Sequence, residues 1–202
     1  VPLPCSSGPK YAYSAGNTLY CVLNRNYVDP RLKALLENLS RTMNEAHPGT
    51  RTLYLDANFP FFDGFPLLPH LSHDDGRKLD LGLYYTDAAG RYLPGALRSP
   101  IGYWGFEQPA RREDAACPSN SWFTLRWDLD WLQPFLPSYP LDVARTRDAV
   151  NWLTTFGREF GVERLFMEPH MAQKLSVTSP ILKFQGCHAA RHDDHIHVQV
   201  SR

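Results

Sequence analysis

Residues 192–200 read His-Asp-Asp-His-Ile-His-Val-Gln-Val, and residue types that bind metals crowd the first half of this stretch. An alternating apolar run follows them. In an extended strand, side chains two positions apart point to the same face, so His195 and His197 should project together. Two imidazoles on one face of a strand form half of a metal site. We therefore expect a second cluster of ligands elsewhere in the chain.

Residues 72–80, Ser-His-Asp-Asp-Gly-Arg-Lys-Leu-Asp, supply that second cluster. His73 precedes a turn that contains glycine, and Asp80 lies in the strand predicted after it, so the loop between them can bring both side chains to one ion. A catalytic zinc takes three protein ligands and keeps a fourth position for water, whose pKa it lowers toward neutrality. The sequence therefore predicts a zinc hydrolase, with Zn²⁺ bound by His73, Asp80 and His197.

Other residues near the two clusters are candidates for catalysis or for support of the ligands. His195 would act on the water or polarise the scissile carbonyl. Asp194 and His192 could orient the imidazoles. Glu168 would be a candidate base if its strand lies beside the last strand. His170, at the start of a short predicted helix, is expected to be a surface residue.

The length and charge of the chain limit its class. Its 202 residues suffice for one domain, residues 1–202, with a core of ordinary size. Lys+Arg and Asp+Glu balance at 21 each, which gives no electrostatic reason to expect a nucleic-acid partner. No apolar run approaches the ~20 residues of a membrane span. The chain begins at Val1 without an initiator methionine or a signal peptide, so we expect a mature or trimmed form.

Four cysteines are widely spaced, at positions 5, 21, 117 and 187, and none forms a Cys-x-x-Cys pair. An even number of scattered cysteines suits two disulfides in an oxidising compartment. Of the three pairings we favour Cys5–Cys21 with Cys117–Cys187, because the first closes a short loop and the second braces the segment before the histidine cluster. Four buried free thiols in a cytosolic protein are the alternative.

The order of predicted elements is irregular, so we expect an α+β fold: a small antiparallel sheet that carries the zinc site, flanked by helices and long loops. Strands are predicted at 50–56, 78–85, 162–168 and 192–200, and helices at 30–46, 142–160 and 169–175. Residues 1–28 are expected to be an irregular N-terminal extension, and 94–120 a long loop. For Trp122, Trp127 and Trp131, core packing is favoured over a substrate platform.

Together, the two clusters resemble the lysostaphin/D-Ala-D-Ala-peptidase/hedgehog group of zinc peptidases. The first motif of that group, Ser-x-His-x-x-Gly-x-x-x-Asp in its looser forms, is similar to residues 72–80, with Ser72 directly before His73. The ending of the penicillin-insensitive murein endopeptidases, His-Asp-Asp-His-aromatic-His-Val, is similar to residues 192–198, with Ile196 in place of the aromatic residue.

The resemblance covers roughly residues 50–85 and 145–202. It implies zinc bound by His73, Asp80 and His197, with His195 catalytic and His192 and His70 near the site. It also implies cleavage of D-alanyl-meso-diaminopimelyl cross-links in peptidoglycan. The carboxypeptidase and dipeptidase branches carry a Glu at the position of Asp194, and because Asp is shorter, we expect His195 to be the base.

Three functions stay open at this point. The first is a DD-endopeptidase that acts on peptidoglycan stem peptides in the bacterial periplasm or outside the cell. The second is a D-Ala-D-Ala carboxypeptidase or dipeptidase of the same fold. The third is an inactive, zinc-stabilised binding domain, as in the hedgehog branch.

Overall fold

The structure is a computed structural model that describes residues 1–6, 12–61, 63–65, 73–111, 115–117 and 124–202. The strands are β1 (Tyr13–Ala15), β2 (Thr52–Tyr54), β3 (Lys78–Gly82), β4 (Val162–Phe166), β5 (Leu182–Lys183) and β6 (His195–Val200). The helices are α1 (Leu19–Val22), α2 (Pro30–Ala46), α3 (Val143–Thr155) and α4 (Pro169–Leu175), with short 3-10 helices η2 (Gln133–Phe135) and η3 (Gly157–Phe160). The described part of the chain therefore has the α+β class that the sequence predicts.

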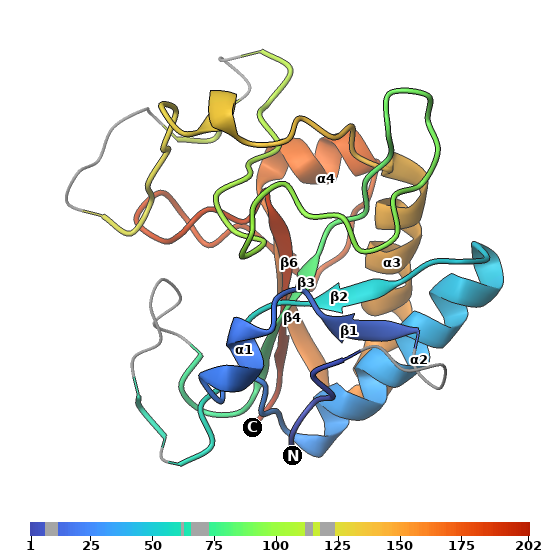
Figure 1. Cartoon of the computed structure of the whole chain (residues 1–202). Helices are drawn as coiled ribbons and strands as arrows, with labels where there is room; N and C mark the ends of the chain where they lie inside the picture. Colours follow the sequence, from blue (N-terminus) through green and yellow to red (C-terminus); the bar gives the residue numbers. More distant parts are fainter. Residues whose placement is uncertain (7–11, 62, 66–72, 112–114, 118–123) are drawn as a thin grey trace.

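The strands form one mixed sheet in the order β1-β2-β3-β6-β4-β5 (Figure 1). The four central strands are antiparallel, whereas β1 and β5 join the two edges in parallel. The prediction of a purely antiparallel sheet is therefore wrong, and so is that of an entirely irregular segment 1–28, which contains β1 and α1. Strands of two or three residues are too short to show the alternating pattern by which strands are recognised.

The two long helices begin where the sequence predicts. The side chain of Asp29 accepts a hydrogen bond from the backbone N–H of Arg31 at 2.8 Å and caps α2. Asp142 caps α3 in the same way. The predicted helix 142–160, however, ends as an α-helix at Thr155 and continues as η3, which Gly161 terminates in the left-handed conformation, φ 84°.

Apolar side chains of the sheet pack on α2 and α3, which lie side by side in Figure 1. On β3 these are Leu79 and Leu81, and on β6 Ile196, Val198 and Val200. Because side chains alternate along a strand, the polar residues between them face the opposite side of the sheet. That side is covered over the site, where Asp80, His195 and His197 are buried, whereas Gln199 further along β6 is half-buried.

The tryptophans of the segment after residue 120 do not pack in the core as predicted. Trp127 is 43% exposed and Trp131 is 70% exposed. Trp122 lies outside the described residues. From residue 124 to Asp142 the described chain is a loop with one 3-10 turn, so it has no regular face that must be buried.

Both predicted disulfides are present, Cys5–Cys21 and Cys117–Cys187. This confirms the favoured pairing and rules out four free thiols. In the described part of the chain, no helix has the length and apolar character that a membrane crossing requires.

Candidate metal centre

The centre is built on the pairing of β3 with β6. In this antiparallel pair Asp80 lies directly opposite His197, and Gly82 lies opposite His195. Side chains opposite one another in such a pair have Cβ atoms about 5 Å apart and point to the same face. The sheet register therefore brings together a carboxylate and an imidazole that are 117 positions apart in the chain.

His73 joins these two residues from the loop before β3. Its Nε2 atom lies 3.3 Å from Oδ1 of Asp80 and 3.3 Å from Nδ1 of His197, and the latter two atoms are 2.9 Å apart. An ion bound tetrahedrally, ~2.1 Å from each donor, would separate the donors by about 3.4 Å. All three residues are buried. The three donor atoms thus lie close enough together to bind one metal ion, with separations slightly shorter than the tetrahedral value.

Neighbouring groups set the orientation of each ligand. Nδ1 of His73 is 2.7 Å from the carbonyl oxygen of Ala57, which accepts a hydrogen bond from the Nδ1–H and leaves Nε2 facing the other ligands. The hydroxyl of Tyr103 donates to Oδ2 of Asp80 at 2.6 Å and accepts from the backbone N–H of Asp56 at 3.1 Å. Oδ1 of Asp80 is left to face the two imidazoles.

His195 lies beside this triad and is oriented by Asp194. Nδ1 of His195 is 2.5 Å from Oδ1 of Asp194, whose Oδ2 accepts from the backbone N–H of Trp104 at 2.6 Å. The other ring nitrogen, Nε2, is 3.7 Å from Oδ1 of Asp80. His195 thus points one nitrogen at the centre while the second is bound to a carboxylate.

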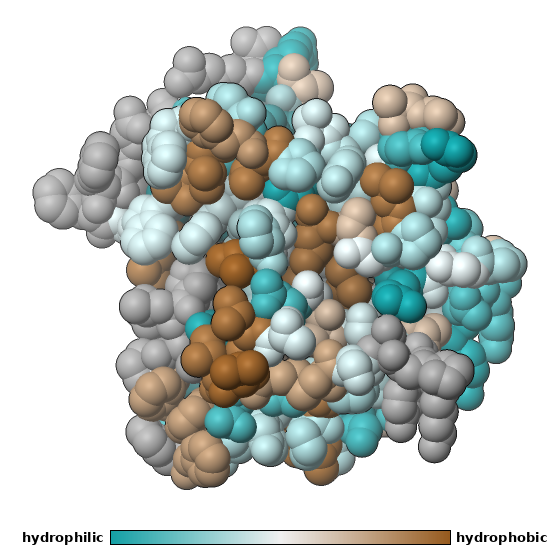
Figure 2. Space-filling model, viewed as in Figure 1, coloured by the Kyte–Doolittle hydropathy of each residue, from teal (hydrophilic) through white to brown (hydrophobic). Residues whose placement is uncertain are grey.

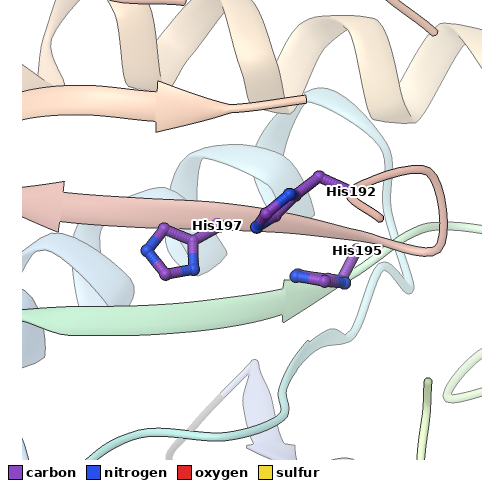
Figure 3. A group of neighbouring side chains, drawn as sticks. All are labelled: His192, His195 and His197. Carbon is purple, nitrogen blue, oxygen red and sulfur yellow. The ribbon is translucent and has the colours of Figure 1, made fainter. Parts of the chain in front are cut away.

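His192 completes a second, overlapping group of possible ligands. One ligand atom from each of His192, His195 and His197 lies within 4.8 Å of the others (Figure 3). The ligand atoms of His73, Asp80 and His197 lie equally close together. The three imidazole rings lie close together. The ring centroid of His192 is 5.0 Å from that of His195 and 5.4 Å from that of His197. The described part of the chain therefore contains a group of five buried residues around one position.

Burial and the nearby carboxylates act in opposite directions on the imidazoles. Burial lowers the pKa of His197 to about 4, although Asp80 opposes this shift, so the ring is neutral and can donate a lone pair. Burial also opposes charge on His195, but Asp80 and Asp194 outweigh it and raise the pKa of His195 to about 9. The pKa values of the two histidines of β6 are therefore shifted in opposite directions although the residues lie two positions apart.

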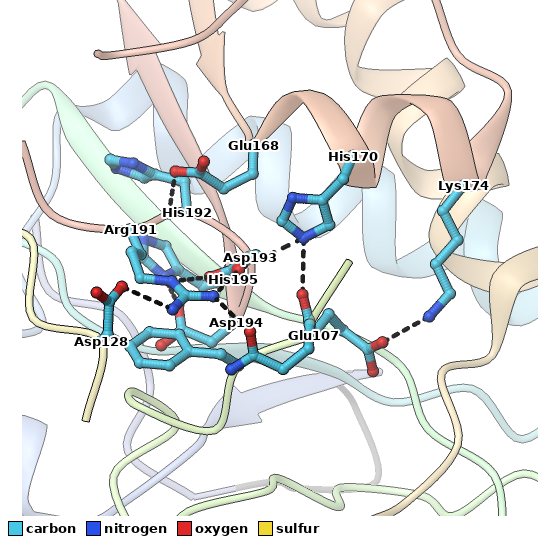
Figure 4. Close-up of polar contacts among 12 residues, drawn as sticks. Glu107, Asp128, Glu168, His170, Lys174, Arg191, His192, Asp193, Asp194 and His195 are labelled. Carbon is cyan, nitrogen blue, oxygen red and sulfur yellow. Dashed lines mark hydrogen bonds and ion pairs between the residues drawn. The ribbon is translucent and has the colours of Figure 1, made fainter. Parts of the chain in front are cut away.

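Glu168 lies next to the centre, where its carboxylate binds Arg126. Its two carboxylate oxygens accept hydrogen bonds from Nη1 and Nη2 of Arg126, each at 2.9 Å, and both side chains are buried. Oε1 of Glu168 is also 3.4 Å from the backbone N–H of His192 (Figure 4). β4 does pair with β6, as the hypothesis of a Glu168 base required. In this geometry, however, Glu168 holds the loop of Arg126 against the segment that carries His192.

A buried ionic network continues from Asp193. Its carboxylate binds Arg191, whose Nη1 also reaches Asp128 at 3.1 Å (Figure 4). His170 lies 8% exposed, with Nε2 at 2.7 Å from the carbonyl oxygen of Glu107. The prediction that His170 is a surface residue is therefore wrong, because the loop of Glu107 covers the start of α4.

The structure gathers most, but not all, of the predicted site. The residues brought together are His73, Asp80, Glu168, His192, Asp194, His195 and His197. His70 lies outside the described residues. Sequence reasoning missed Tyr103, Trp104 and Arg126, which contact the centre or its supports from loops. Their segments carry no recognisable motif or periodicity, so only their position in space identifies them.

Comparison with known proteins adds no family to this description. None of the known protein families matches the chain, and no curated protein is significantly similar to it. The fold and site define an α+β protein with buried histidine and aspartate groups that could hold a metal ion.

Proposed function

We propose that this protein is a zinc-dependent peptidoglycan hydrolase, a DD-endopeptidase that cleaves D-alanyl-meso-diaminopimelyl cross-links. The observation that carries the proposal is the spacing of the three donor atoms of His73, Asp80 and His197, 2.9–3.3 Å apart. Two nitrogens and one carboxylate oxygen are a donor set typical of catalytic zinc, which keeps one position for water.

When bound there, zinc would supply a Lewis acid and lower the pKa of water toward neutrality. The chain supplies the remaining functions. His195, with Nδ1 bound to Asp194, presents Nε2 to the centre and is placed to move a proton or to polarise the scissile carbonyl. Hydrolysis adds the hydroxyl of water to the carbonyl carbon and a proton to the leaving amine, so a group that transfers protons is needed beside the metal.

The choice of substrate rests on the resemblance of residues 72–80 and 192–198 to the motifs of murein endopeptidases. The two disulfides fit this choice, because they persist in oxidising compartments and peptidoglycan lies outside the cytoplasm. We therefore also propose a periplasmic or secreted bacterial location, with peptidoglycan stem peptides as the partner.

The test is incubation of purified cross-linked muropeptide dimer with the protein, with the products identified by mass spectrometry. Wild type should release monomers, whereas His197→Ala and EDTA-treated protein should not. His47→Ala is the matched control, because His47 pairs with Asp148 at the end of α2 and should leave activity unchanged. Release of D-alanine alone would assign a carboxypeptidase, and bound zinc without turnover would assign a binding domain.

A further inference from the structure

An apolar groove of about 350 Å³ opens beside the candidate centre, within the size range of ligand pockets. We define the apolar groove by five of its lining residues: Leu19, Leu23, Ile101, Trp104 and Trp127. Leu19, Leu23 and Trp127 are among the exposed large hydrophobic residues of the protein. Figure 2 shows apolar side chains gathered on this face over α1. Apolar surface of this kind commonly marks a binding site.

Tyr103 lies between the apolar groove and the candidate centre and contacts both. The Tyr103 side chain lines the groove, while its hydroxyl binds Asp80 and its ring packs edge-on against His195, with centroids 5.1 Å apart. Trp104 and Trp127 also line a smaller hollow together with Asp194, the partner of His195. A molecule that lies in the groove would therefore rest against the tyrosine that contacts both Asp80 and His195.

The groove offers an apolar and electrically balanced surface. Among its described lining residues, Arg25 alone carries a formal charge. The guanidinium of Arg25 is bound to the buried carboxylate of Asp56, with Nε 2.8 Å from Oδ1 and a second contact through Nη2. Since the charge of Arg25 is already balanced by Asp56, the groove suits an uncharged group better than a carboxylate or an ammonium.

The backbone of Trp104 is held in an unusual conformation. Trp104 has φ 69°, a left-handed conformation that residues other than glycine seldom adopt. Its N–H donates to Asp194 at 2.6 Å, and its carbonyl oxygen accepts from the side-chain amide of Gln133 at 2.8 Å. Strained backbone that its surroundings enforce is concentrated at functional sites. These two bonds hold the backbone of a residue that lines the groove.

We propose that the apolar groove is a subsite for a large, uncharged, apolar side chain next to the scissile bond. This inference rests on the proposed function, because the groove is a subsite only if the centre cleaves peptides. The methyl group of D-alanine would leave most of the groove unfilled. The protein should therefore cleave peptides in which a bulkier apolar residue replaces D-alanine, or flanks the bond on its other side, faster than the unmodified cross-link.

The test uses two panels of synthetic cross-link peptides, with D-Ala, D-Leu or D-Phe on the acyl side, or an apolar residue on the amine side. In one of the two panels, the peptide with a bulky apolar residue should be cleaved with a kcat/KM about 10-fold or more above that of the unmodified D-Ala peptide. Trp127→Ala should remove most of this gain. Trp131→Ala is the matched control: Trp131 is a tryptophan of the same loop, 70% exposed against 43% for Trp127, does not line the groove, and should keep the wild-type ratio.

A binding measurement separates failure of this inference from failure of the proposed function. The uncharged fluorophore N-phenyl-1-naphthylamine should bind wild type and Trp131→Ala, and bind Trp127→Ala at least several-fold more weakly. Cleavage of the dimer without any gain for bulky residues would overturn the subsite and leave the endopeptidase standing. Fluorophore binding at the groove without cleavage of any peptide would overturn the endopeptidase. Dimerisation of the protein that Trp127→Ala abolishes would make the groove an interface and overturn the subsite.

Discussion

The hydroxyl of Tyr103 should control the affinity of the centre for zinc. It donates to Oδ2 of Asp80 at 2.6 Å in a fully buried position, so Tyr103→Phe removes a hydrogen bond to a charged group that water cannot replace. Such bonds contribute about 1.5–3 kcal/mol. At about 1.4 kcal/mol per tenfold change in affinity, the zinc dissociation constant should rise by about 10- to 100-fold. This is the range typical of partners that orient metal ligands.

The assay is a competition titration of zinc against a chelator of known affinity, at fixed pH and with both disulfides intact. Tyr84→Phe is the matched control, because its hydroxyl is also buried but bonds Thr52 at 2.8 Å, away from the centre. It should leave the zinc affinity at the wild-type value. If Tyr103→Phe binds zinc as tightly as wild type, then Tyr103 does not position Asp80 and the reasoning is refuted.

Three further predictions test the ligands and the supports of the site. His73→Ala should lose stoichiometric zinc, measured by elemental analysis after dialysis; retention of one equivalent would point to the group of His192, His195 and His197 instead. Arg126→Met should lower the free energy of unfolding, measured by urea denaturation, by about 3–5 kcal/mol, because it leaves the carboxylate of Glu168 buried without its partner. Replacing both residues by Met should lower it clearly less. Replacing the cysteines by alanines should lower the free energy of unfolding by about 4 kcal/mol for the Cys117–Cys187 pair and about 3 kcal/mol for the Cys5–Cys21 pair. The first pair closes a loop of 70 residues and the second one of 16, and a longer loop loses more entropy in the unfolded chain. The reverse order of the two losses would contradict this reasoning.

Much of the local structure could be read from the chain. The alternation of polar and apolar residues predicted strands at 78–85 and 192–200, with His195 and His197 on one face of the second strand. The structure has shorter strands at 78–82 and 195–200, and places the two histidines on one face as predicted. Asp29 followed by Pro30 marked the start of α2, and Asp142 marked that of α3. These features depend on neighbours in sequence, where steric and hydrogen-bond preferences act over a few residues.

By itself, the sequence determined which residues have ligand chemistry and on which faces of their strands they lie. Tertiary structure alone decided that β3 pairs with β6 in the register that sets Asp80 opposite His197. It also decided that the loop of Tyr103 and Trp104 closes over this face, and that Arg126 binds Glu168. Contacts across such sequence distances depend on how the whole chain packs. Their residues leave no periodic pattern by which they could be recognised beforehand.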